Sequence, residues 1–474
     1  MLVSRLPAQL YTCEPLDDPH TMVIELSPGD DIRSILYSAN SGTTYLLNTG
    51  TYHVTDIIQI LAEDVTIRSA SKNRNDVILD GNAGGQQLSR SNFASEILQI
   101  RASRVTVADL TIRYAQDHGL HLMPPPNGTT IKDIRLHNIR VYDCGEQLIK
   151  ANSNGNPSNL QWVDSSILEC SLIEFVDNSV MQPQGGGFYT GGLDVHGGRG
   201  WIIRGCTFRG IENQGKSMEH AIHLWSRSRE TLIENSYFEN CWRAVGLGMK
   251  RDSSGFARTY SDAAGATPYF DHIGGIVRNN VVYNQSGIHL ETGIEIMNVK
   301  DAEVYHNTVI SEDQPFNSME YRWPNTTVTI KNNLCTHRIM KRDNASGNLA
   351  ANITNASTNL FANIAGRDFH LKNGSSTAID RGVTLPGNKS GVDIDGVARG
   401  ANPDIGADET NSVAVAPPAR PRTGLRNHLI QAGYDLRGKR VLDLDATRLR
   451  RRANGFSGIL FLVYDNASAG LIIR

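Results

Sequence analysis

Short segments with alternating apolar residues recur along the middle of the chain. Alternation with a period of two is typical of a β-strand that buries one face and exposes the other. If such strands stack as successive rungs, the residues between the apolar positions form columns on the outer face. The segments are ILQIR (97–101), GLHLM (119–123), LIKAN (148–152), GLDVH (192–196), AIHLW (221–225), AVGLG (244–248) and GIEIM (293–297).

Stacking these segments in register predicts two outward columns. A solvated strand face usually carries Thr, Ser, Asn and scattered charge, whereas a run of ionisable residues and histidines indicates a site. The first column reads Gln99, His121, Lys150, Asp194, His223, Gly246 and Glu295. The second reads Arg101, Met123, Asn152, His196, Trp225, Gly248 and Met297.

A second repeat consists of two short apolar strands joined at a polar bend residue, and it recurs at intervals of about 25 to 45 residues, which is typical of a β-solenoid. Asparagine suits such a bend because it tolerates the left-handed conformation, and its amide can bond to the same amide one rung away. Strands too close for crossover helices predict a parallel coil. The predicted bends are Asp109, Asn138, Cys170, Gly205, Asn235, Asn279, Asn307 and one of Asn332 and Asn333.

Composition supports an all-β fold and excludes several function classes. Glycine is abundant, with 44 residues, and only 7% of residues are aromatic. With 46 basic and 49 acidic residues, the net charge of −3 gives no basic surface for nucleic acid. No apolar run reaches about 18 residues, so we expect no membrane span. We also expect a monomer. None of the six cysteines belongs to a CxxC pair, so a zinc site is not expected.

Turn-rich and proline-rich stretches divide the chain into three parts. Residues 1–410 are expected to form the parallel coil, with an N-terminal cap and loops that wall a groove. Residues 411–424 read as a Pro-rich linker, and residues 425–474 as a small β-rich unit. The longest loops are expected at 123–130, 152–162, 177–191, 211–220 and 249–272.

Two segments near the end carry a family resemblance. DFHLKNGSSTAIDRG (368–382) and VDIDGVARGANPDIGADE (392–409) resemble the closing segment of secreted bacterial right-handed parallel β-helix proteins. That resemblance implies an all-β right-handed parallel β-helix and a secreted or extracellular protein, although MLVSRLPAQLYTCEP lacks the apolar core of a signal peptide; we therefore expect a mature or engineered start. YDLRGKRVLDL and GFSGILFLVYD are similar to C-terminal sorting domains, and the alternative is an appendage packed on the coil.

The two columns bring acid–base groups together. Period-2 geometry places Asp194 and His196 about 6.5–7 Å apart on one strand face. Adjacent rungs place Lys150 on one side and His223 on the other, roughly 4.8 Å away. Lys150, Asp194, His196 and His223 are therefore expected to converge within about one sugar ring.

These groups suit removal of the C-5 proton of a uronic acid in a polysaccharide. The sugar carboxylate needs a cation, such as Lys150 or an arginine; His196 or His223 can act as base. The other histidine or Tyr189 would protonate the leaving oxygen, Asp194 would orient the cluster, and Trp225 would stack on a sugar. The candidate substrate-binding residues are Arg101, His121, Asn152, Tyr189, Trp225, Arg227, Arg243 and Glu295.

The segment LDVH also resembles the active site of parallel β-helix mannuronan C-5 epimerases, which carry Asp-Pro-His on one rung, lysine on the previous rung and a nearby tyrosine. Asp194, His196 and Lys150 match those positions. Val195 replaces the proline, and Gly191 stands where the family has tyrosine, with Tyr189 two residues further back. Related lyases share the proton-abstraction step, so the resemblance implies an anionic polysaccharide substrate and either a lyase or an epimerase. We favour the lyase.

Three alternatives remain open at this point. A glycoside hydrolase needs two carboxylates about 5–5.5 or 6.5–9.5 Å apart, and only Glu219 and Glu295 stand near Asp194. A non-catalytic carbohydrate-binding solenoid would use the same face. A calcium ion that neutralises the uronate is a further option, with the candidate ligands Glu291, Glu295, Asp252 and Asp271.

Overall fold

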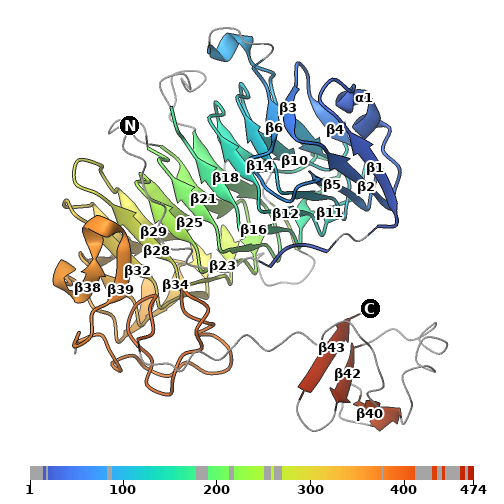
Figure 1. Cartoon of the computed structure of the whole chain (residues 1–474). Coiled ribbons are helices and arrows are strands. Elements are labelled where there is room, and N and C mark those ends of the chain that lie inside the picture. The colour runs from blue at the N-terminus through green and yellow to red at the C-terminus, as the bar shows by residue number, and fades with distance from the viewer. Residues whose placement is uncertain are drawn as a thin grey trace. The chain divides into compact units, whose positions relative to one another are not determined.

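The computed structural model describes residues 14–17, 20–82, 88–177, 190–212, 218–249, 258–260, 269–375 and 377–410, together with four strands near the C-terminus. The chain divides into two compact units, residues 1–413 and 414–474. The first unit is a right-handed parallel β-helix, as the sequence predicted (Figure 1).

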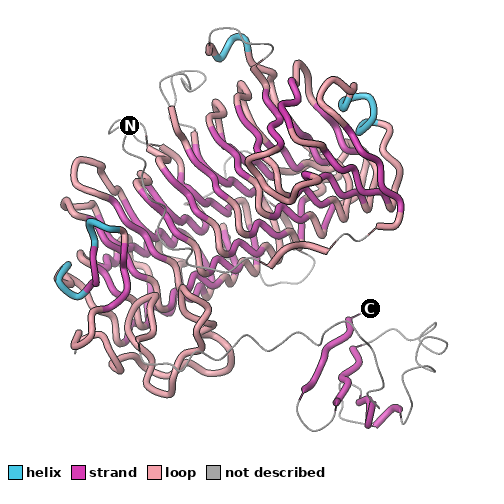
Figure 2. Tube along the Cα trace, in the orientation of Figure 1, coloured by secondary structure: helices cyan, strands magenta, loops and turns pink. Residues whose placement is uncertain are grey.

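Three parallel sheets form the coil, seen as stacked strands joined by loops in Figure 2. The chain visits the sheets in the same order on each turn. Sheet 1 holds β1 (Met22–Leu26), β2 (Thr43–Leu47), β5 (Val65–Ser69), β8 (Thr106–Ala108), β12 (Arg135–His137), β16 (Ile167–Glu169), β19 (Ile202–Arg204), β23 (Leu232–Glu234), β27 (Ile276–Arg278), β31 (Ala302–Tyr305), β34 (Thr327–Lys331) and β37 (Ser346–Ala350). Sheet 2 holds β3 (Gly50–His53), β6 (Val77–Asp80), β9 (Thr111–Arg113), β13 (Arg140–Tyr142), β17 (Leu172–Glu174), β20 (Thr207–Arg209), β24 (Tyr237–Glu239), β28 (Val281–Asn284), β32 (Thr308–Ser311) and β35 (Leu334–Cys335).

Sheet 3 carries the predicted columns. Its strands are β4 (Ile58–Ile60), β7 (Leu98–Ile100), β10 (Leu120–Leu122), β14 (Gln147–Ala151), β18 (Gly191–His196), β21 (His220–Trp225), β25 (Arg243–Gly248), β29 (Thr292–Met297), β33 (Asn317–Arg322) and β36 (Ile339–Lys341). Apolar residues at matching positions stack inside the coil and are fully or almost fully buried. This inner row fixes the register because a slip by one residue would expose it. The row contains Ile149, Leu193, Ile222, Val245, Ile294 and Met319.

Left-handed residues turn the chain from sheet 1 into sheet 2. The predicted bends at Asp109, Asn138, Cys170, Gly205, Asn235 and Asn279 all have φ between 49° and 59°. At the next turn the prediction of Asn307 is wrong, because His306 takes the left-handed conformation, with φ 52°. Of the last pair, Asn332 is the bend.

An asparagine ladder does form, one residue after the bends. Nδ2 of Asn280 donates to Oδ1 of Asn307 over 3.0 Å, Asn307 donates to Asn333 over 3.0 Å, and Asn333 donates to Asn352 over 2.9 Å. The same oxygens accept backbone N–H groups of the preceding rung. Each amide thus satisfies buried backbone groups that the turn leaves unpaired.

The closing segment packs on the later bends. The side chain of Asn279 donates to the carbonyl of Ser390 over 2.6 Å, and Asn332 donates to the carbonyl of Val383 over 2.8 Å. Arg399 is 2% exposed and donates to Asn279 and to Glu409. The antiparallel pair β38 (Phe361–Asn363) and β39 (Asp368–Leu371) adds apolar side chains to the outer face of sheet 2.

Shorter elements complete the description. Helix α1 (Ile32–Tyr37) buries Ile32 and Leu36 against the N-terminal rungs. A short parallel pair joins β11 (Ile131–Lys132) to β15 (Val163–Asp164). A short parallel sheet contains β22 (Ser228–Arg229), β26 (His272–Ile273) and β30 (Val299–Lys300), with β26 in the middle. The second unit contains an antiparallel sheet of β40 (Ile430–Tyr434), β41 (Arg440–Leu442), β42 (Ile459–Tyr464) and β43 (Ser468–Ile473).

Some predicted segments lie outside the described residues. These are the linker 411–424, most of the loops 177–191 and 249–272, and half of the loop 211–220. The loops 123–130 and 152–162 are described, and Asn154 joins them by donating to the carbonyl of Pro126 over 3.1 Å. In the part of the chain that the structure describes, no helix has the length and hydropathy that a membrane span needs.

Candidate functional site

The first predicted column is observed in register on sheet 3. His121 lies beside Lys150, Lys150 beside Asp194, and Asp194 beside His223. The column continues through Gly246 to Glu295. In the second column His196 lies beside Trp225. The buried inner row of β14, β18 and β21 is what turns these polar residues outward.

Four residues form a hydrogen-bonded group that we call the Lys150 cluster: Lys150, Asp194, His196 and Trp225. The ammonium of Lys150 donates to Oδ2 of Asp194 and lies 2.9 Å from Nε2 of His196. Nε2 of His196 is also 3.1 Å from Oδ2 of Asp194. The indole N–H of Trp225 donates to Oδ1 of Asp194 over 2.7 Å. Three rungs thus meet at one carboxylate.

Burial and charge set the protonation of this cluster. Burial alone would raise the pKa of Asp194, but Lys150 and His196 outweigh it and hold this pKa well below its usual value. Burial lowers the pKa of His196; Asp194 opposes this and Lys150 adds to it, and the net pKa is lowered. At neutral pH the cluster therefore contains a carboxylate and a neutral imidazole.

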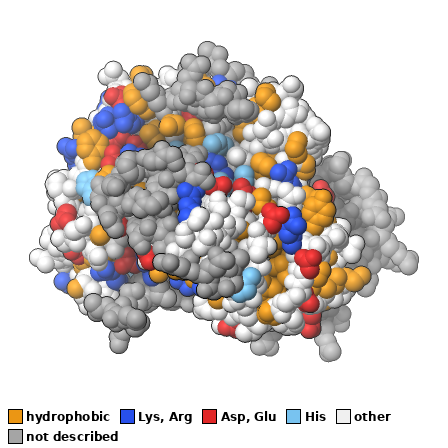
Figure 3. All heavy atoms as spheres, turned by 90° about the horizontal axis from the view of Figure 1, so that it is seen from above, with side chains coloured by type: hydrophobic (Ala, Val, Ile, Leu, Met, Phe, Trp, Pro, Cys, Tyr) orange, Lys and Arg blue, Asp and Glu red, His pale blue; other side chains and the backbone are white. Residues whose placement is uncertain are grey.

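Exposure differs within the cluster. The side chains of Lys150 and Asp194 are 5% exposed, whereas that of His196 is 20% exposed. Trp225 is half-buried and meets His196 edge-on, with ring centroids 4.3 Å apart. His196 and Trp225 are therefore the members that a ligand on this face can reach. Seen from above, acidic, basic and histidine side chains lie side by side near the middle of the molecule (Figure 3).

His223 belongs to the same column but bonds elsewhere. Its ring is buried and stacks on Trp225, with centroids 5.5 Å apart and planes at 7°. Its Nε2–H donates to the carbonyl of Gly248 over 3.0 Å, and Nδ1 faces Glu219 at 3.5 Å. The hydrogen bonds that the structure describes for His223 thus lead away from Lys150 and Asp194.

Three predicted substrate-binding residues form a polar network on the rung of Lys150 and the two rungs before it. Nδ1 of His121 lies 2.8 Å from Glu96, and its Nε2 lies 3.1 Å from Oδ1 of Asn152. Arg101 donates to the side chain of Gln99 over 2.7 Å. This network borders Lys150, because His121 and Lys150 are register partners.

The other predicted residues do not join the Lys150 cluster. Arg243 pairs with Glu291 at 2.8 Å, and Glu295 lies 2.9 Å from Nε2 of His220. Arg227 is buried in the turn after β21, where its guanidinium lies over the ring of Tyr269. Tyr189 lies outside the described residues.

The predicted calcium ligands do not come together. Glu291 pairs with Arg243, and Glu295 faces His220. Asp271 is fully buried and accepts the hydroxyl of Tyr269. Asp252 lies outside the described residues. The described carboxylates of this set are thus engaged by other protein groups, and Glu291 and Glu295 share Arg243, which lies 3.9 Å from Glu295.

Sequence reasoning missed His220, which lies beside His223 with ring centroids 4.4 Å apart. Strict alternation would point His220 inward with Ile222. In the structure Ala221 and Ile222 are both in the core, so His220 and His223 point outward together. The small residue Ala221, and its counterparts Gly192 and Ala244 on the neighbouring rungs, were the available signal for this break in alternation.

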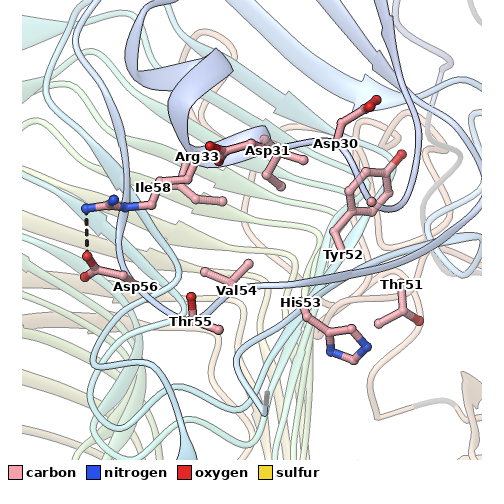
Figure 4. Close-up of a pocket in the computed structure, with 12 residues that line it drawn as sticks. Asp30, Asp31, Arg33, Thr51, Tyr52, His53, Val54, Thr55, Asp56 and Ile58 are labelled. Carbon is pink, nitrogen blue, oxygen red and sulfur yellow. Dashed lines mark ion pairs between the residues drawn. The ribbon is translucent and has the colours of Figure 1, made fainter. Parts of the chain in front are cut away.

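One cavity lies far from this column along the chain, at α1. It has a volume of about 400 Å³ and is lined by residues 29–33, 51–56 and 58 (Figure 4). Arg33 and Asp56 form an ion pair there at 2.7 Å, with both side chains more than half exposed. An exposed pair of this kind contributes little, so this cavity has no groups comparable to the Lys150 cluster.

No protein-family model and no curated protein matches the sequence. Among solved structures, pectate lyase Pel9A is 14% identical with a TM-score of 0.51, over 83% of this chain and 97% of its own. An alginate lyase from Paenibacillus sp. str. FPU-7 is 16% identical with a TM-score of 0.43, over 71% and 100%. A polygalacturonase from Erwinia carotovora ssp. carotovora is 9% identical with a TM-score of 0.32, over 73% and 98%. The likeness to pectate lyase Pel9A confirms the predicted resemblance to parallel β-helix proteins at the level of the fold.

Proposed function

We propose that the protein is a polysaccharide lyase that acts on a uronic-acid-containing polysaccharide by C-5 proton abstraction and β-elimination. The observation that carries the proposal is the Lys150 cluster, in which a buried ammonium, a carboxylate and a partly exposed imidazole meet within hydrogen-bond distance. The alternative on the same cluster is uronan C-5 epimerisation, because both reactions begin with loss of the same proton.

His196 is the proposed base. It is the most exposed ionisable member of the cluster, and its lowered pKa keeps it neutral near pH 7. Nε2 faces Lys150 and Asp194, and Nδ1 has no hydrogen-bond partner among the described residues. Nδ1 is therefore the nitrogen we assign to the sugar C–H.

Lys150 supplies the positive charge that the reaction needs. Loss of the C-5 proton leaves negative charge that spreads into the neighbouring carboxylate, and a nearby ammonium stabilises it. Asp194 holds Lys150 in place by accepting from its ammonium, and it accepts from Nε2–H of His196 in the tautomer that leaves Nδ1 unprotonated. Trp225 offers an aromatic ring beside His196 for a sugar. Tyr189 is the proposed proton donor to O-4 of the leaving sugar, because the burial of His223 makes that histidine a poorer donor.

An extracellular location is part of the proposal. Cys170 is disulfide-bonded. Disulfides persist mainly in oxidising compartments, which is where polysaccharide substrates are met.

The test is absorbance near 235 nm during incubation with a panel of uronic-acid polysaccharides, with EDTA and with calcium added back. A rise reports the unsaturated product, and Lys150→Ala and His196→Ala are expected to abolish it. Lys132→Ala is the matched control, because Lys132 is an exposed lysine on β11 outside the cluster. The EDTA and calcium arms test the option that a calcium ion neutralises the uronate.

Absence of a rise on every substrate would overturn the lyase assignment. Exchange of the C-5 proton in heavy water would then identify an epimerase, and new reducing ends without unsaturation would identify a hydrolase. Saturable binding with neither product would identify a carbohydrate-binding solenoid. A rise that survives His196→Ala would place the base elsewhere.

A further inference from the structure

A second group of ligand-type side chains lies one rung beyond Asp194. We call it the Glu219 cluster: Glu219, which precedes β21, and His220 and His223 on that strand. Their candidate donor atoms lie within 4.8 Å of one another. His220 and His223 are 3% and 4% exposed, and the side chain of Glu219 is 29% exposed. The cluster is thus built into the wall of the coil with one side open.

The distances within the cluster fit a shared ion better than direct hydrogen bonds. Oε2 of Glu219 is 3.6 Å from Nδ1 of His220 and 3.5 Å from Nδ1 of His223. Good N–H···O bonds are about 2.7–3.2 Å long. Two donors on one tetrahedral zinc, with bonds of about 2.0–2.1 Å, lie roughly 3.3–3.5 Å apart.

Each imidazole is held through its other nitrogen. Nε2 of His220 lies 2.9 Å from a carboxylate oxygen of Glu295, and Nε2 of His223 donates to the carbonyl of Gly248 over 3.0 Å. A histidine that binds a metal usually donates a hydrogen bond from its second ring nitrogen in this way, which leaves the first nitrogen with a lone pair for the metal. Nδ1 of His220 is buried and has no hydrogen-bond partner among the described residues, so a buried polar atom aims at the centre of the cluster.

The neighbouring rung makes room for this arrangement. A Cβ atom at Gly246 would lie 2.6 Å from both Cδ2 and Nε2 of His220. Gly246 in the polar column therefore leaves the space across which His220 reaches Glu295, two rungs away. A side chain there would displace the imidazole from its partner.

Two other histidine groups lack these features. In the group of Glu96, His118 and His121, both nitrogens of His121 already lie within 3.1 Å of oxygen atoms. In the group of His370, Asp395 and Asp408, both nitrogens of His370 are engaged by carboxylates at 2.6 and 2.7 Å. Neither of these two imidazoles has a nitrogen left for an ion.

We propose that Glu219, His220 and His223 bind one divalent transition-metal ion of the zinc type. Two imidazole nitrogens and one carboxylate oxygen suit Zn²⁺ and its first-row neighbours, whereas Ca²⁺ prefers an all-oxygen site. The expectation that the chain has no zinc site followed from its cysteines alone, and histidine with glutamate offers a different ligand set. Trp225 stacks on His223 and donates a hydrogen bond to Asp194. An ion bound to His223 would therefore help to hold Trp225, and through it the Lys150 cluster, in place.

The test uses the full chain without any polysaccharide, so its result is independent of the proposed lyase activity. The protein is stripped with EDTA, dialysed and titrated with Zn²⁺ by calorimetry, and Co²⁺ is added to a second sample for visible absorption. We expect one ion per chain and a d–d spectrum of low coordination number. Glu219→Gln, His220→Ala and His223→Ala are each expected to weaken binding by at least about tenfold.

His121→Ala is the matched control, since it removes a buried histidine beside a glutamate on the same column and is expected to leave Zn²⁺ affinity unchanged. Circular dichroism checks the fold of each variant. If a histidine variant misfolds, Glu219→Gln still tests the site, because it alters the most exposed ligand. Binding of no zinc by the wild type would overturn the proposal. So would equal affinity in Glu219→Gln, or loss of binding only in His121→Ala.

Discussion

Trp225 donates its indole N–H to Oδ1 of Asp194 over 2.7 Å, while Lys150 and His196 meet Oδ2 of the same carboxylate. Both oxygens of Asp194 are thus engaged by groups from three rungs. A carboxylate held in this way orients its neighbours and is poorly placed to attack a sugar. This arrangement argues against the two-carboxylate chemistry of a glycoside hydrolase.

Trp225→Phe separates the two roles of this residue. Phenylalanine keeps an aromatic ring, but Oδ1 of the buried Asp194 loses its hydrogen-bond donor. Leaving a buried acceptor unpaired costs about 1–3 kcal/mol. In the proposed lyase we expect kcat to fall about tenfold, with little change in KM. Trp225→Ala should raise KM as well, because the sugar loses its aromatic surface. Steady-state kinetics at 235 nm measure both, and a kcat unchanged in Trp225→Phe would show that the hydrogen bond to Asp194 does not matter for turnover.

Asp194→Asn should change the pH dependence as well as the rate. The negative charge of Asp194 raises the pKa of His196, so its removal lowers that pKa further. His196 would then stay neutral to lower pH, and the acid limb of the kcat profile should move to lower pH. We expect kcat to fall about 10²-fold, in the range of a lost acid–base contribution.

Asp301→Asn is the control for that experiment. Asp301 is exposed and left-handed, a conformation that asparagine also adopts, and its carboxylate accepts from Thr327 away from the cluster. Its profile should match the wild type. A slower Asp194→Asn enzyme with an unmoved acid limb would argue that His196 is not the base.

Much of sheet 3 could be predicted from the sequence because buried rows fix register. Ile149, Leu193 and Ile222 must face the core, and this alone turns Lys150, Asp194 and His223 outward. The bend at His306 could not be predicted in this way, since His and Asn both adopt the left-handed conformation and Asn307 is used by the amide ladder instead. His220 was missed because two consecutive residues of β21 face inward.

Side-chain partners were the least predictable feature. Arg227 looked like a cation for the substrate, yet the turn after β21 directs it onto Tyr269. Such choices depend on long loops, whose course alternation and bend residues do not specify.

Glu169 makes part of the stability pH-dependent. Burial alone would raise its pKa, but bonds from His137, Arg204 and Arg135 lower it to about 2. A lowered pKa in the folded state stabilises the fold above the unfolded value near 4.5, and this contribution is lost as the pH falls toward 2. Glu169→Gln should therefore cost about 3 kcal/mol at pH 7 and much less at pH 2–3.

Urea unfolding at several pH values measures this difference. Glu63→Gln is the control, because Glu63 is 54% exposed and pairs with Arg104, which is also exposed, so its loss should cost less than about 1 kcal/mol at any pH. A cost for Glu169→Gln that stays constant from pH 7 to pH 2–3 would contradict the assigned pKa.

Gly246→Ala probes the space that the column reserves for His220. The added Cβ would lie 2.6 Å from the imidazole, and overpacking of this kind costs about 1–3 kcal/mol. Because the imidazole of His220 would move away from Glu295, the zinc affinity should also fall at least about tenfold. The Lys150 cluster depends on the ion only indirectly, so Gly246→Ala should lose less lyase activity than Lys150→Ala. Gly400→Ala is the control, since a Cβ there would meet the carboxylate of Glu409 at 3.4 Å and would lie away from His220. Thermal unfolding with and without Zn²⁺ reads out both effects: wild type and Gly400→Ala should gain stability from the ion, and Gly246→Ala should gain little. An equal gain in all three proteins would mean that the position of His220 over Gly246 has no part in metal binding.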